Sequence, residues 1–72
     1  MNDGPNLTLY AVIRASSKYA YQGRYTGKSV AMRVTHLEER TDYTFHLDNG
    51  NRYRREDLTF YVKDGERFIK LR

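Results

Sequence analysis

The feature that most constrains this fold is the apolar pattern: apolar and polar residues alternate with a period of two through most of the sequence. Side chains of a strand point alternately to the two faces of a sheet, so this period predicts strands with one apolar face. The one competing helical pattern, Leu37 to Arg40, is too short for a stable helix. The sequence therefore predicts an all-β domain with strands at residues 7–15, 19–25, 29–36, 42–48, 51–55 and 59–63, the last paired with 66–71.

The chain has 72 residues and no cysteine. This length predicts a single small β domain, 1–72, with a flexible N-terminal segment at 1–6; its core is too small for an elaborate active site, so we expect no enzyme and no cofactor. Without cysteine there is no disulfide framework and no cysteine nucleophile, and we expect a reducing, cytoplasmic location. The longest apolar run, Tyr10 to Ile13, falls far short of the ~20 residues that span a bilayer, so we expect no membrane segment.

The sequence predicts two hairpins, and the one nearer the C-terminus contains the dipeptide Asp64-Gly65. This dipeptide suits a two-residue type I′ turn, in which both central residues need a positive φ angle. Such a turn pairs Phe60 with Ile69 and Leu58 with Leu71, so the apolar side chains of both strands share one face.

The second predicted hairpin lies around Asn49-Gly50. A two-residue turn at this dipeptide would place two arginines on the core face of the sheet. A three-residue loop, Asp48 to Gly50 with Gly50 in the left-handed conformation, instead pairs Phe45 with Tyr53 and keeps the inner face apolar. We therefore predict the three-residue loop.

Five to six short strands joined by tight turns predict a small SH3-like barrel or a strongly curved antiparallel sheet, with one 3₁₀ turn at residues 55–58. The turn chemistry of Val34 to Leu58 loosely resembles that of Tudor and KOW-type modules. This resemblance covers about a third of the chain and assigns neither a family nor a function. The apolar strand faces predict a core of Leu9, Ile13, Val30, Met32, Val34, Phe45, Leu47, Leu58, Phe60 and Ile69.

The net positive charge of the chain is confined to its N-terminal half. No acidic residue occurs between Gly4 and Leu37, and this stretch holds five cations, Arg14, Lys18, Arg24, Lys28 and Arg33. From Glu38 onwards, eight basic and eight acidic residues cancel. Cations without neighbouring acids face solvent or an anionic ligand, so the pattern indicates either a soluble basic surface or a nucleic-acid interface.

The segment from Lys18 to Lys28 interleaves cations with tyrosines. Nucleic-acid binders use cations to replace phosphate counterions and flat rings to stack on unpaired bases. In a regular strand Tyr19, Tyr21 and Tyr25 would line one face, and packing of these rings into the core is the alternative. A second basic cluster follows at residues 52–55. If Tyr53 points inward, Arg52 and Arg54 point outward. The predicted nucleic-acid-binding residues are therefore Arg14, Lys18, Tyr19, Tyr21, Arg24, Lys28, Arg33, Arg52 and Arg54.

The two histidines give no reason to expect a metal site. His36 falls at the end of a predicted strand and His46 on the polar face of another. A site would need both rings side by side with a carboxylate such as Asp48, and no further His or Cys completes a closed ligand set. We therefore predict no bound metal.

Two functional hypotheses of different classes follow. The first is a non-enzymatic domain that binds DNA or RNA through a basic, tyrosine-rich surface. The alternative is a small protein interaction module, such as a phage-type, accessory or inhibitor protein, that docks on a larger protein through the same Tyr and Arg side chains. The unpaired edges of a small sheet also allow a homodimer. Salt-dependent binding to nucleic acid separates the first hypothesis from the others.

Overall fold

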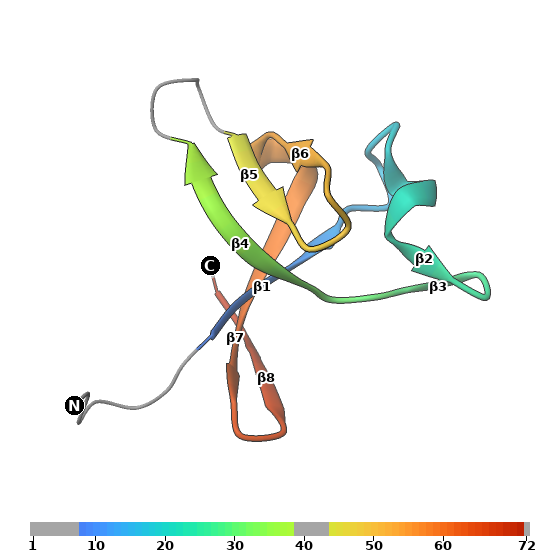
Figure 1. Cartoon of the computed structure of the whole chain (residues 1–72). Coiled ribbons are helices and arrows are strands. Elements are labelled where there is room, and N and C mark those ends of the chain that lie inside the picture. The colour runs from blue at the N-terminus through green and yellow to red at the C-terminus, as the bar shows by residue number, and fades with distance from the viewer. Residues whose placement is uncertain (1–7, 39–43, 72) are drawn as a thin grey trace.

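The computed structural model describes residues 8–38 and 44–71; the N-terminal segment 1–6 lies outside these ranges. Its main element is a six-stranded antiparallel sheet with strand order β6-β5-β4-β1-β7-β8 (Figure 1). The strands of this sheet are β1 (Thr8–Ile13), β4 (Met32–Glu38), β5 (Thr44–Leu47), β6 (Arg52–Tyr53), β7 (Leu58–Asp64) and β8 (Arg67–Lys70). The predicted all-β class is confirmed, and no α-helix occurs in the described residues.

The segment between β1 and β4 forms a separate small unit. It contains the 3₁₀ helix η1 (Ala20–Gly23) and a two-stranded hairpin of β2 (Arg24–Tyr25) and β3 (Lys28–Ser29). A second 3₁₀ helix, η2 (Arg55–Asp57), leads into β7, as the sequence predicted. Within the described ranges, no helix has the length and apolarity needed to cross a membrane.

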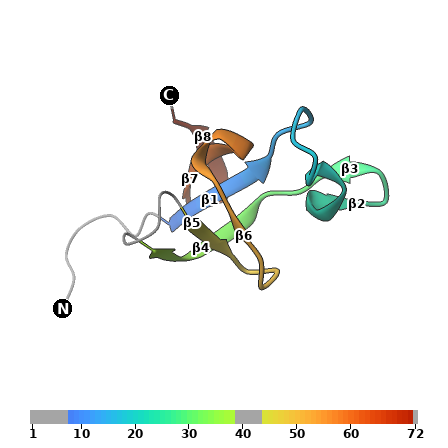
Figure 2. The same ribbon diagram turned by 90° about the horizontal axis from the view of Figure 1, so that it is seen from above.

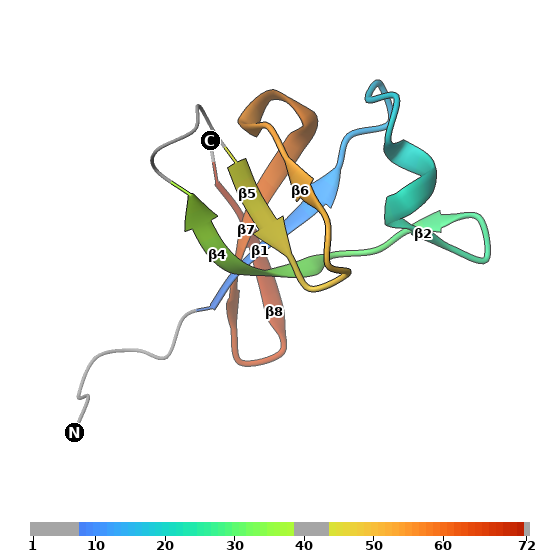
Figure 3. The same ribbon diagram turned by 45° about the horizontal axis from the view of Figure 1, so that its top comes forward.

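The six-stranded sheet curls into a half-barrel (Figures 2 and 3), and its core is built from side chains of β1, β5, β6 and β7. The fully buried apolar residues are Ala11, Ile13, Leu47, Tyr53 and Leu58. Half-buried side chains packed against them are Tyr19, Met32, Val34, Phe45 and Phe60. Seven predicted core residues are thus confirmed, namely Ile13, Met32, Val34, Phe45, Leu47, Leu58 and Phe60.

The prediction was wrong for two core residues. Ile69 remains 42% exposed because β7 and β8 extend as a hairpin beyond the curled part of the sheet (Figure 1). Val30 is 39% exposed because it lies in the irregular connection between β3 and β4, where its N–H bonds the Gly23 carbonyl oxygen at 2.9 Å. Leu9 is half-buried and lies outside the central cluster.

The predicted strand at 19–25 was also wrong over most of its length. Residues 20–23 form η1. Its turns are closed by backbone hydrogen bonds, in which the Ala20 N–H donates to the Ser17 carbonyl oxygen and the Gln22 N–H donates to the Tyr19 carbonyl oxygen. Gly23 then packs so closely on Ile13 that a Cβ atom at residue 23 would lie 3.0 Å from Ile13 Cδ1. The predicted strand 29–36 is likewise interrupted, because β3 ends at residue 29 and β4 runs over 32–38.

One predicted hairpin register is confirmed and the other is shifted. Phe45 pairs with Tyr53, and Gly50 has a φ of +87°, as predicted for a three-residue loop. At the last hairpin Asp64 pairs with Arg67, which makes the turn Gly65-Glu66 instead of Asp64-Gly65. Of these two turn residues only Gly65 has a positive φ. A type II′ turn requires a positive φ at its first central residue alone, whereas a type I′ turn requires it at both, so this turn is of type II′. The observed register differs from the predicted one by two residues, so every side chain of the hairpin still points to the predicted face of the sheet.

Candidate functional site

The clearest candidate surface is the unit between β1 and β4, which we call the aromatic-basic lobe and define as residues 18–29. Figures 1 and 3 show it projecting from one side of the half-barrel. It presents the exposed cations Lys18, Arg24 and Lys28 and contains no acidic residue. The rings of Tyr21 and Tyr25 are 71% and 74% exposed. Two exposed tyrosines and three exposed cations therefore lie within one short segment that has no acidic residue.

The tip of the lobe is a tight hairpin with an unusual backbone. Tyr25 pairs with Lys28, which leaves Thr26 and Gly27 as the two turn residues, with φ angles of +50° and +81°. A β-branched residue rarely adopts a positive φ, and the conformation costs of order 1–3 kcal/mol. The Thr26 hydroxyl donates a hydrogen bond to the Tyr25 carbonyl oxygen at 2.6 Å. The turn holds Tyr25 beside Lys28 on one face of the hairpin, whereas Arg24 pairs with Ser29 and points to the other face.

A polar network fastens the lobe to the loop between β5 and β6. The buried Tyr53 hydroxyl donates to Gln22 Oε1 at 2.6 Å and accepts from Asn49 Nδ2 at 2.9 Å. Gln22 Nε2 in turn donates to the Tyr21 hydroxyl at 3.0 Å. The position of the exposed Tyr21 ring is therefore linked to a core residue of the sheet.

Tyr19 belongs to the structural base of the lobe. Its half-buried ring meets the edge of Tyr53 at a centroid distance of 6.0 Å, and Lys18 Nζ lies 5.3 Å from the Tyr19 ring centroid. The predicted common face of Tyr19, Tyr21 and Tyr25 is wrong, because η1 replaces the regular strand that would create it. Tyr25 is not among the predicted binding residues, but it is as exposed as Tyr21 and stands in the same basic, acid-free segment, a signal that could have added it to the candidates.

Two of the other predicted cations lie at a second place, beside η2. Arg14 and Arg54 line an open hollow of about 500 Å³ together with Arg55, Lys70 and the apolar side chains of Leu58, Phe60 and Leu71. Arg14 Nη1 donates to the Glu56 carbonyl oxygen at 3.4 Å, and Arg54 forms an ion pair with the Glu56 carboxylate at 3.8 Å. Glu56 thus offsets part of the positive charge of this hollow.

The remaining predicted cations stand on the sheet itself. Arg33 is an exposed residue of β4, paired with Tyr10 of β1, and its backbone N–H bonds Asp48 Oδ2 at 3.3 Å. Arg52 is an exposed residue of β6, paired with His46. The structure therefore gathers Lys18, Arg24 and Lys28 in the lobe but distributes the other four cations over the half-barrel.

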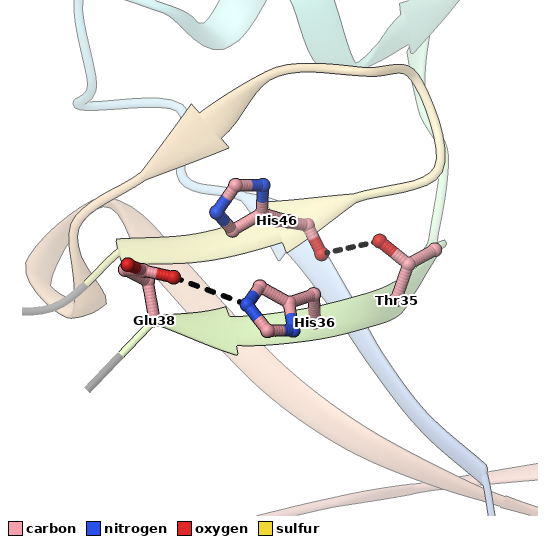
Figure 4. Close-up of polar contacts among 4 residues, drawn as sticks. All are labelled: Thr35, His36, Glu38 and His46. Atoms are coloured by element: carbon pink, nitrogen blue, oxygen red, sulfur yellow. Dashed lines mark hydrogen bonds and ion pairs between the residues drawn. The ribbon is translucent and has the colours of Figure 1, made fainter. Parts of the chain in front are cut away.

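The two histidines meet on the sheet, an arrangement that the sequence pattern did not reveal. His36 pairs with His46 across β4 and β5, and the ring centroids lie 5.0 Å apart (Figure 4). His36 Nε2 lies 3.1 Å from Glu38 Oε1, so the adjacent carboxylate is Glu38 and not Asp48. The pairing depends on an irregularity of β4 between Val34 and His36, for which alternating polarity gives no signal.

The chain was compared with protein-family models, with curated proteins and with solved structures. No family model, curated protein or solved structure matches it. The residues and geometry described above therefore carry the functional argument alone.

Proposed function

We propose that this chain is a non-enzymatic nucleic-acid-binding domain whose aromatic-basic lobe contacts the sugar-phosphate backbone and unpaired bases of DNA or RNA. The observation that carries the proposal is the 71% and 74% exposure of Tyr21 and Tyr25 among three cations, without an acidic residue in the lobe. Packing could have hidden these rings, as it hides Tyr53, yet both stand in solvent.

The physical chemistry of the lobe suits a single strand. Stacking of a base on an aromatic ring contributes ~1–3 kcal/mol and tolerates any base. Each neutralised phosphate releases condensed counterions, so cations add affinity that salt weakens. Tyr21 and Tyr25 supply the rings, and Lys18, Arg24 and Lys28 supply the charge. Arg33 and Arg52 lie on β4 and β6, away from the lobe. In this proposal they do not contact the ligand but add to the positive electrostatic potential that attracts it.

The proposal includes an SH3-like arrangement of the half-barrel. Three consecutive strands, β4, β5 and β6, form a meander, after which the 3₁₀ helix η2 returns the chain to β7, which pairs with β1. This order of elements supports the SH3-like barrel, with β8 as an added edge strand and the aromatic-basic lobe as the long connection after β1. A cytoplasmic location fits both the absence of cysteine and a nucleic-acid ligand.

Fluorescence anisotropy with labelled single-stranded and duplex oligonucleotides tests the proposal. Affinity for the single strand should fall with salt at a log-log slope of about −0.7 per neutralised phosphate. The single variant Arg24→Ala should weaken binding and flatten the slope, whereas Arg67→Ala, an exposed cation at the far hairpin, is the matched control and should change neither. The double variant Tyr21→Ala/Tyr25→Ala should weaken binding without flattening the slope. Absence of binding at low salt refutes the proposal.

A protein partner is the second candidate, and a different surface favours it. Among the described residues, the edge strand β8 pairs with a strand on one side only and, with the residue after it, exposes Phe68, Ile69 and Leu71 at 47%, 42% and 39%. An open edge with apolar side chains can pair with a strand of another chain or of a second copy. Sedimentation analysis of the purified chain distinguishes a homodimer from a monomer, and a monomer without nucleic-acid affinity leaves a larger protein as the candidate ligand.

A further inference from the structure

The outer face of β4 and β5 gathers two imidazoles and one carboxylate. Val34 pairs with Leu47 but His36 pairs with His46, so Thr35 is an extra residue in β4. This bulge turns His36 to the face that His46 occupies, and Glu38, two residues on, shares that face (Figure 4). One nitrogen or oxygen from each of the three side chains lies within 4.8 Å of the others. Three metal-ligating groups from two adjacent strands therefore converge.

His46 supplies a second, independent observation. Its Nε2 atom is buried and has no hydrogen-bond partner among the described residues. Buried polar atoms in folded proteins are nearly always bonded, because removing them from water without a partner costs free energy. The Thr35 hydroxyl donates to the backbone carbonyl oxygen of His46 and so does not bond this ring nitrogen (Figure 4). A ligand that accepts the electron pair of this nitrogen would remove that cost.

We propose that His36, Glu38 and His46 form a binding site for one divalent transition-metal ion, with Zn²⁺ as the ion that the donor set fits best. Imidazole and carboxylate groups bind Zn²⁺ at about 2.0–2.2 Å, so tetrahedral ligand atoms lie roughly 3.3 Å apart. His36 Nε2 and Glu38 Oε1 already stand 3.1 Å apart. The His46 donor lies within 4.8 Å of the other two, so metal binding requires a change in the His46 side-chain torsions. Three protein ligands leave the fourth position to water or an anion.

Metal binding replaces one polar contact and satisfies another. The ion takes the place of the hydrogen shared by His36 Nε2 and Glu38 Oε1, and neutral His36 then carries its proton on Nδ1. With two neutral imidazoles and one carboxylate, the loaded site carries a net charge of +1. Arg52, the pairing partner of His46 on β6, adds a neighbouring cation that opposes the ion. The site shares no residue with the aromatic-basic lobe, and this inference does not rest on nucleic-acid binding.

Isothermal titration calorimetry of ZnCl₂ into the full chain, free of any histidine tag, tests the site. We expect saturable binding of one Zn²⁺ per chain and none of Mg²⁺, because Mg²⁺ prefers an all-oxygen shell. The variants His36→Asn and His46→Asn should each weaken Zn²⁺ binding at least tenfold. Glu38→Gln should also weaken it, whereas Asp48→Asn, which removes the same charge outside the cluster, should not. Arg52→Ala should tighten binding severalfold by removing the opposing charge.

Proton NMR gives a readout that identifies the ligands directly. The chain has only two histidines, so two sets of imidazole signals report the whole site. Both sets should shift with Zn²⁺ and saturate at one equivalent. If His46→Asn fails to fold, His36→Asn remains decisive, because the His36 side chain is 58% exposed and its replacement leaves the core intact. Unchanged imidazole signals, or Zn²⁺ affinity that persists in a folded His36→Asn variant, would overturn the proposal.

Discussion

Replacing Tyr53 with Phe tests how the aromatic-basic lobe is fastened to the half-barrel. The substitution keeps the ring, which is 97% buried and touches the edge of Tyr19, but removes the hydroxyl that bonds Gln22 at 2.6 Å and Asn49 at 2.9 Å. Each intramolecular hydrogen bond contributes about 1 kcal/mol net, so the two together predict a loss of roughly 2 kcal/mol. For a domain of this size the melting temperature should fall by about 8–16 °C.

Thermal and urea unfolding followed by circular dichroism measure this loss. Tyr61→Phe is the matched control, because it removes a hydroxyl from a half-buried tyrosine that makes no side-chain hydrogen bond within the described residues. The stability of this variant should change by less than ~0.5 kcal/mol. The double variant Gln22→Ala/Tyr53→Phe should lose less than the sum of the single variants, because both remove the same bond. Equal stability of Tyr53→Phe and the unchanged chain would refute the anchoring role of the hydroxyl.

Three further substitutions test the core and the turns. Phe45→Ala removes a ring whose centroid lies 4.8 Å from that of Phe60, and it should cost about 3 kcal/mol, enough to leave much of so small a domain unfolded by circular dichroism. Gly23→Ala places a Cβ atom 3.0 Å from the buried Ile13 side chain and should lower the unfolding free energy in urea by about 1–3 kcal/mol. Thr26→Asn should raise the melting temperature, with a gain of about 1 kcal/mol, because Asn tolerates the observed φ of +50° better than Thr; an unchanged melting temperature would contradict strain at this turn.

The sequence predicted the fold class and one hairpin well because both depend on local alternation. The loop that ends in Gly50 could be assigned because the competing register would have buried arginines, which costs far more than a choice of turn type. At Gly65 the two candidate registers differ by two residues and place the same side chains inside. The pattern of apolar and polar residues is therefore the same in both registers and cannot distinguish them. The observed register is the one with a type II′ turn at Gly65-Glu66.

The lobe shows where local patterns stop being informative. Its composition indicates a basic, aromatic surface, but the alternation of its tyrosines predicts a strand where residues 20–23 form a 3₁₀ helix. The deciding contact is between Gly23 and Ile13, residues that approach because the chain folds back on the end of β1. That approach is tertiary, and it accompanies the 3₁₀ helix at residues 20–23, which leaves Tyr19 half-buried and Tyr21 exposed. Which tyrosines are exposed thus depends on a tertiary contact that the alternation of the sequence does not encode.

The histidine cluster depends on a single inserted residue. Without the bulge at Thr35, the pairing of Val34 with Leu47 would continue as His36 with Phe45, and the His36 ring would point into the apolar face. The bulge changes the register by one, so Leu37 pairs with Phe45 and both imidazoles reach the outer face. The same irregularity therefore keeps a polar ring out of the core and creates the donor set that we assign to a metal ion. The cluster lies in the second half of β4 and in β5, whereas the aromatic-basic lobe ends at residue 29, before β4 begins, so the two candidate sites can be altered separately.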